Sequence, residues 1–158
     1  MSEHEQLYPQ SYRRRHAARS TPNRTWRVCA DVQKPGMLRL KRAYEPSGRA
    51  DGHRILVDRL WPRGLSKEKA AIAEWMKEIA PSTELRRWFA HDPEKWREFQ
   101  RRYRQELRTR DDLVREIARL ASRGPVTLVY GARDEAHNDA VVLAAVVRSR
   151  MRLNVRAL

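Results

Sequence analysis

The sequence predicts a single α/β domain of three layers, in which a mostly parallel sheet has helices on both faces. Two short apolar runs, RILVD at 54–58 and PVTLVYG at 125–131, have the composition of buried central strands. Amphipathic helices lie between them, and strands that alternate with helices favour a parallel sheet. The chain of 158 residues is long enough to form one core, and no internal repeat is visible.

We expect this domain to occupy residues 37–152. Residues 1–36 contain scattered prolines and polar residues without a helical or strand period, which predicts a disordered or loosely attached tail. Residues 153–158 are expected to form a C-terminal tail. The single cysteine, Cys29, falls in the first tail, so we expect no intramolecular disulfide, no cysteine-cluster metal site and no catalytic thiol.

Other segments are weaker candidates for strands. MLRLKRAY at 37–44 alternates apolar and polar residues, as a half-buried strand does. EPSGRADGH at 45–53 reads as a loop because of its proline and glycine content. AIAEWM at 71–76 fits either a strand or a helix, and we expect Ile72 and Trp75 to lie in the core.

The helices have clearer signals. One is predicted over 81–89. In the next, Asp92 is the expected N-cap with Pro93 at the first helical position, and the helix continues to about Arg108. The apolar stripe of this helix consists of Trp96, Phe99, Tyr103 and Leu107.

Two more helices follow. Asp111 is expected to cap a helix that runs to Arg123 and ends at Gly124. The inward-facing residues predicted for it are Leu113, Ile117 and Leu120. The last helix, over 135–151, is mostly apolar, and its arginines collect at the C-terminal end, where the helix dipole favours positive charge.

The formal net charge is +14, from 34 lysines and arginines against 20 acidic residues. This balance favours a polyanionic partner such as nucleic acid, and RRYRQELRTR offers Arg101, Arg104 and Arg108 on one helix. A merely basic surface explains the same composition, because phosphate-backbone binding needs a clustered face. No apolar stretch approaches the roughly 20 residues that cross a bilayer. We therefore expect no membrane association and a cytoplasmic location.

Polar and aromatic residues follow both apolar strands. Ligands of open α/β sheets bind beyond the carboxyl ends of the strands, which is where segments 58–64 and 130–138 are expected. If the two strands are neighbours, both turns line one crevice. The predicted ligand-binding residues are Arg59, Trp61, Arg63, Gly64, His91, Tyr130 and Asn138. The predicted acid–base residues, catalytic if the protein is an enzyme, are Asp58, Asp134 and His137.

The chemistry of these residue types points to an anion. Arg59 and Arg63 carry planar, permanently charged groups that suit phosphate or carboxylate. Gly64 allows close approach of the backbone to a ligand, while Trp61 and Tyr130 offer rings for stacking.

Structural explanations stay open beside this one. Asp58 could pair with a neighbouring arginine, Trp61 could form a packed corner, and His137 with Asn138 could cap the last helix. His91 could belong to a turn. No H-E-x-x-H spacing supports a metal site, and no G-x-S-x-G turn supports a serine hydrolase.

Three segments resemble a known family: RILVDRLWPRGLSKEKA, WMKEIAPSTELRRWFAHDPEKWREFQRRY and VTLVYGARDEAHNDAVVL. Over about residues 37–152 the chain resembles the YeaO-like branch of bacterial domain-of-unknown-function family 488. The resemblance implies a small single-domain α/β protein and supplies no substrate, reaction or catalytic residue. More distant relatives look richer in cysteine after the last strand. This chain has Tyr130, Gly131 and Ala132 there, so thiol chemistry is not implied.

Two functions therefore remain open. The first is a strand-end site for a small anionic, phosphate-bearing or nucleotide-like molecule, in a binding protein or an enzyme. The second is a nucleic-acid-associated module that uses the basic helices. No cofactor and no oligomeric state is predicted.

Overall fold

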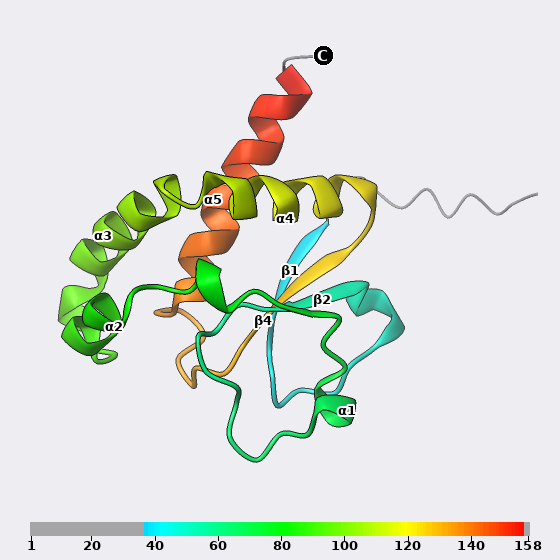
Figure 1. Cartoon of the computed structure of the whole chain (residues 1–158), viewed down its shortest axis with the longest axis horizontal. Coiled ribbons are helices and arrows are strands. Elements are labelled where there is room, and N and C mark those ends of the chain that lie inside the picture. Colours follow the sequence, from blue (N-terminus) through cyan, green and yellow to red (C-terminus); the bar gives the residue numbers. More distant parts are fainter. Residues whose placement is uncertain (1–36, 157–158) are drawn as a thin grey trace, which may run out of the picture. The chain divides into compact units, whose positions relative to one another are not determined.

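The computed structural model describes residues 37–156, with side chains through residue 153. The tail predicted over 1–36 lies outside the described residues. The described chain forms a four-stranded sheet in the order β1-β4-β2-β3, with every neighbouring pair parallel (Figure 1). The strands are β1 (Leu38–Arg42), β4 (Val126–Tyr130), β2 (His53–Leu56) and β3 (Glu74–Trp75). The predicted single α/β domain with a parallel sheet is confirmed.

The two predicted central strands are direct neighbours. In the register of β2 with β4, Ile55 lies opposite Leu128. All five residues of β4 are buried, as a strand covered on both faces requires. Because β2 and β4 are parallel and adjacent, their carboxyl ends meet at one edge of the sheet. The segments that follow them, 58–64 and 131–138, both begin at this edge.

Within residues 37–156, five helices accompany the sheet: α1 (Lys67–Ala70), α2 (Thr83–Phe89), α3 (Trp96–Arg108), α4 (Asp111–Arg123) and α5 (Asp139–Arg156). Short 3₁₀ turns occur at Arg49–Asp51, Lys77–Ile79 and Pro93–Lys95. Ser82 caps α2 by accepting a hydrogen bond from the Leu85 N–H at 3.1 Å. The predicted cap at Asp92 is confirmed, because its carboxylate accepts from the Glu94 N–H at 3.0 Å with Pro93 next in sequence.

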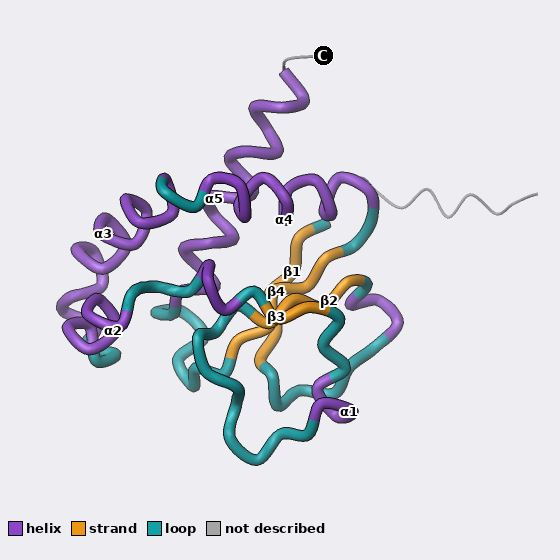
Figure 2. The backbone as a smooth tube through the Cα atoms, in the orientation of Figure 1, coloured by secondary structure: helices purple, strands orange, loops and turns teal. Residues whose placement is uncertain are grey.

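The two faces of the sheet are covered unequally. The long helices α3, α4 and α5 pack on one face, where Ile55 and Leu128 join the main core with Phe99, Ile117 and Leu143. On the other face, a smaller cluster of Ala43, Leu56 and Val129 packs against Trp61, Leu65 and Ile72. This second cover is mostly loop, with the single-turn helix α1 between β2 and β3 (Figure 2).

The structure corrects several local predictions. Trp75 is 41% exposed rather than in the core, because it lies on the two-residue edge strand β3 and Met76 is buried instead. Asp111 is the first residue of α4 and not its cap, and its carboxylate pairs with Arg115 and Arg150. The last helix begins at residue 139 rather than 135 and continues to 156, past the predicted boundary at 152.

Candidate functional site

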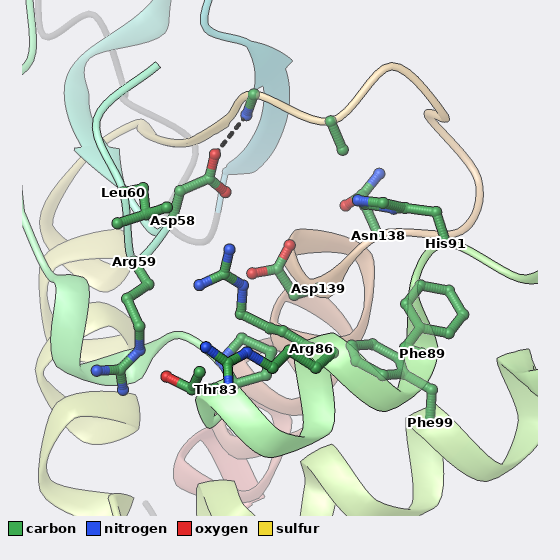
Figure 3. A pocket seen from close by; sticks show the side chains of 14 residues that line it. Asp58, Arg59, Leu60, Thr83, Arg86, Phe89, His91, Phe99, Asn138 and Asp139 are labelled. Atoms are coloured by element: carbon green, nitrogen blue, oxygen red, sulfur yellow. Dashed lines mark hydrogen bonds between the residues drawn. The ribbon is translucent and has the colours of Figure 1, made fainter. Parts of the chain in front are cut away.

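A cavity of about 560 Å³ opens at the carboxyl edge of the sheet. It lies between the chain that leaves β2, the helix α2, the turn after β4 and the first residue of α5 (Figure 3). Its lining residues are Asp58, Arg59, Leu60, Pro81, Thr83, Arg86, Arg87, Phe89, His91, Phe99, Gly131, Ala132, Asn138 and Asp139. The volume falls within the roughly 300–1,000 Å³ of small-molecule sites.

Asp58 joins the ends of the two central strands. Its Oδ2 accepts a hydrogen bond from the Gly131 N–H at 2.7 Å, drawn as the dashed line in Figure 3. A Cβ added to Gly131 would lie 2.9 Å from that oxygen, so glycine allows this close approach. Burial raises the pKa of Asp58, against the lowering effects of the Gly131 hydrogen bond and of Arg86 and His91 nearby. Asp58 thus links the ends of β2 and β4 through one carboxylate oxygen and also lines the cavity.

Asp139 brings a second carboxylate to the same cavity. It is the first residue of α5, where helix N–H groups favour negative charge. Desolvation raises the pKa of Asp139 to about 7, and the negative charge of Asp58 adds to the rise. Its hydrogen bonds with main-chain N–H groups and the charge of Arg86 act in the opposite direction. The two carboxyl groups therefore influence each other's ionisation.

Three arginines supply positive charge around these acids: Arg59, Arg86 and Arg87. None of them forms a salt bridge with any other described residue, the two cavity carboxylates included. The Nε of Arg59 is buried without a hydrogen-bond partner among the described residues. Guanidinium groups without a salt-bridge partner are available to bind phosphate or carboxylate.

Aromatic rings form the apolar wall. Phe89 and Phe99 stack with their ring centroids 4.3 Å apart, and the His91 ring lies 5.8 Å from that of Phe89. His91 takes a positive φ of 57°, in the turn that follows α2. This uncommon backbone conformation places the imidazole on the cavity wall. The cavity thus combines acidic, basic and aromatic groups.

Four of the residues predicted for the site line this cavity: Asp58, Arg59, His91 and Asn138. Asn138 is 1% exposed, and its amide is already occupied. Its Oδ1 accepts from the Val141 N–H at 3.1 Å, and its Nδ2 donates to the Asp134 carbonyl at 2.9 Å. These bonds are those of a helix cap, so Asn138 shapes the entrance to α5.

Asp134 and His137 do not line the cavity and pair with each other nearby. The Asp134 carboxylate accepts from the main-chain N–H groups of Ala136 and His137, and lies 2.8 Å from the His137 Nδ1. The hydrogen bonds from the His137 main chain and side chain lower the pKa of Asp134. The His137 ring meets Trp96 edge-on at 5.2 Å. This pair stabilises the turn between β4 and α5.

The aromatic corner after β2 also lies away from the cavity. Trp61 donates from Nε1 to the Leu65 carbonyl at 2.7 Å and contacts the Trp75 ring edge-on at 5.6 Å. Arg63 is exposed, and Gly64 takes a φ of 72° with no atom within 4 Å of an added Cβ. Tyr130 was also predicted to bind a ligand and also lies outside the cavity lining. Its side chain is 4% exposed within the main core, and burial raises the pKa of its hydroxyl. The Trp61 corner packs against the sheet outside the cavity, and its predicted role in ligand binding stays a prediction.

The sequence reasoning missed Thr83, Arg86, Arg87 and Asp139. One signal was available for Asp139, since it is a lone acidic residue directly before the apolar run 140–147 of α5. A carboxylate in that position either caps the helix or faces a site. Arg86 and Arg87 had no such signal, because consecutive arginines on a short helix are typical of an exposed face.

Within residues 37–156, no group of three or more metal-ligating side chains converges. No helix in that same range is long and apolar enough to cross a membrane.

Comparisons with known proteins place the chain in a family. A family model described as "Inactive DUF488-N3 subclade" matches residues 37–156. The chain belongs to the DUF488 family. Among its relatives, the uncharacterised protein YeaO of Escherichia coli is 44% identical over 112 residues, covering 71% of this chain and 97% of YeaO. The YeaO-like resemblance is therefore confirmed.

Mycobacterial relatives match this chain with similar identity and over a similar length. The uncharacterised protein Rv3073c of Mycobacterium tuberculosis is 42% identical over 113 residues, covering 72% of this chain and 95% of the relative. The uncharacterised protein Mb3100c of Mycobacterium bovis gives the same figures. No solved structure matches the chain.

Proposed function

We propose that this DUF488 protein binds a small phosphate-bearing molecule in the strand-end cavity and does not catalyse its conversion. One observation carries the proposal: Arg59, Arg86 and Arg87 surround a cavity and have no salt-bridge partner among the described residues. Arginines without a countercharge at a concave site are a typical arrangement for an anion. The cavity also lies where ligands of parallel α/β sheets bind.

A binding role is favoured over an enzymatic one. The matching family model carries the word "inactive" in its description. The predicted acid–base pair of Asp134 and His137 lies outside the cavity, in a turn that it stabilises. The cavity lining contains no serine, cysteine or lysine, so Thr83 is its one hydroxyl among the described lining residues.

Isothermal titration of the full chain with methyl phosphate and with ribose 5-phosphate, at low salt and pH 8, tests the proposal. We expect Arg86→Gln to weaken binding of both about tenfold or more, because a hydrogen bond to a charged group contributes about 1.5–3 kcal/mol. Arg97→Gln is the matched control, since Arg97 is an exposed arginine of α3 outside the cavity. Equal losses in both variants, or no binding of either compound at millimolar concentration, would refute the proposal.

Nucleic-acid binding is the second candidate, and one observation favours it. A second cavity of about 550 Å³ between α3, α4 and α5 brings together Arg104, Arg108, Arg150 and Arg152. Other arginines count against it, since Arg101 and Arg102 bind Glu98. If this candidate is correct, removing Arg104 and Arg108 by substitution with glutamine lowers the salt dependence of duplex binding by about two phosphate contacts.

A further inference from the structure

We propose that the ligand is a phosphate monoester that also carries sugar hydroxyl groups, with its phosphate on the arginines and its hydroxyls on Asp58 and Asp139. This inference rests on the proposed function and extends it to a ligand class. The basic and acidic groups both face the cavity, and the two carboxylates come from different elements, the end of β2 and the start of α5 (Figure 3).

The acidic wall disfavours ligands that are anionic throughout. Two like charges 4 Å apart repel by about 1 kcal/mol in water and by several times more at a partly buried site. A pyrophosphate or a dicarboxylate that filled the cavity would place a second anion against Asp58 and Asp139. A ligand that fits both walls therefore carries hydrogen-bond donors at its other end.

The carboxylates have acceptor capacity for such donors. Asp58 uses Oδ2 for the Gly131 N–H, and its Oδ1 has no hydrogen-bond partner among the described residues. Asp139 forms no salt bridge within the described part of the chain, and its carboxylate accepts from the main-chain N–H groups of Asp139 and Ala140, which leaves part of its acceptor capacity free. An ionised carboxylate accepts several hydrogen bonds, and acidic side chains near strand ends bind the hydroxyls of ribose in other α/β folds.

The aromatic wall fits the same class of ligand. Phe89 and Phe99 are buried and stack on each other, so they contribute apolar lining, while the exposed His91 ring beside them offers a face to a ligand. Such a face packs against a sugar ring or a nucleobase. A cavity of about 560 Å³ has room for a pentose phosphate and for a mononucleotide. A pentose phosphate and a mononucleotide are both hydroxylated phosphate esters, and the titrations below include one of each.

The experiment compares methyl phosphate, ribose 5-phosphate and adenosine 5′-monophosphate as ligands of the full chain at pH 8. In the wild type we expect the two hydroxylated esters to bind at least tenfold more tightly than methyl phosphate. Asp139→Asn should reduce this preference to about twofold and should leave methyl phosphate binding equal or stronger. Asp58→Asn is a second variant that keeps an oxygen for the Gly131 N–H. Circular dichroism confirms that each variant is folded.

The outcomes separate this inference from the proposed function. If all three compounds bind equally and Arg86→Gln weakens them all, the cavity binds phosphate, and the hydroxyl assignment is wrong. If both aspartate variants still prefer the hydroxylated esters, other groups bind the sugar hydroxyls, and the assignment is again wrong. If no phosphate compound binds, the proposed function fails and the inference with it. A mononucleotide that binds more tightly than ribose 5-phosphate would identify a nucleobase contact.

Discussion

Replacing Asp139 with asparagine should make the protein more stable at alkaline pH and leave its stability nearly unchanged at acidic pH. The folded protein keeps the Asp139 proton up to a pKa of about 7, because burial and the charge of Asp58 both disfavour ionisation. The unfolded chain releases that proton near the ordinary value of 3.8. Between these values the folded state binds more protons, so the free energy of unfolding falls as pH rises.

The size of the stability change follows from the difference between the folded-state and unfolded-state pKa of Asp139. Each pH unit of separation corresponds to about 1.4 kcal/mol, and roughly three units give an upper limit of about 4 kcal/mol. The limit is not reached by one residue alone, because Asp58 and Asp139 titrate as a pair. Asparagine has an oxygen for the same main-chain N–H groups and carries no charge. We therefore expect the stability difference between variant and wild type to grow by about 2–3 kcal/mol from pH 4 to pH 8.

Urea denaturation at half-unit pH intervals, followed by tryptophan fluorescence, measures this difference. Asp134→Asn provides a control of opposite sign, because the pKa of Asp134 is lowered by its hydrogen bonds with His137. Loss of that group should reduce stability most above pH 4 and least in acid. A stability difference for Asp139→Asn that stays constant from pH 4 to pH 8 would show that the carboxyl is not perturbed, and the reasoning about the cavity would be wrong.

The remaining predictions concern the scaffold. Gly52→Ala should lower the free energy of unfolding by about 3 kcal/mol or more, because Gly52 has a φ of 62° and an added Cβ would lie 2.0 Å from the Pro125 carbonyl oxygen. Gly48→Ala, at a site with no atom within 4 Å, should change it by less than about 0.5 kcal/mol in the same urea titration. Tyr103→Phe should cost about 1–2 kcal/mol through loss of a buried 2.8 Å hydrogen bond, whereas Tyr44→Phe on the surface should have little effect.

The fold was largely predictable because its strongest signals are local. The two apolar runs became the adjacent strands β2 and β4, and the stripe of Phe99, Tyr103 and Leu107 is buried on α3. Trp75 was misplaced because sequence cannot distinguish a central strand from a two-residue edge strand. At the edge its indole remains exposed and donates to the Asp58 carbonyl at 2.8 Å.

The candidate site was predictable only in part, because a cavity depends on packing between distant segments. The order of the strands brought the ends of β2 and β4 together, so Asp58 was expected at this edge of the sheet. The path of α2 across that edge had no signal in the sequence, and it determines that Arg86 faces the cavity while Arg63 does not. Tyr130 follows the inward alternation of β4 and enters the core, which the turn-like sequence after it concealed.

The composition of the cavity is unfavourable for the stability of the folded protein. Asp139 loses hydration, and the nearby Arg86 does not come within salt-bridge distance to compensate it. A corner that served only the fold would be more stable with these two groups in contact or with apolar residues in their place. Separated charges of opposite sign around an open volume are expected where a ligand completes the interactions, since a site prepared for a ligand commonly lowers stability. The ligand proposed above, with an anionic end and a hydroxylated end, would account for both the perturbed carboxyl and the unpaired guanidinium groups.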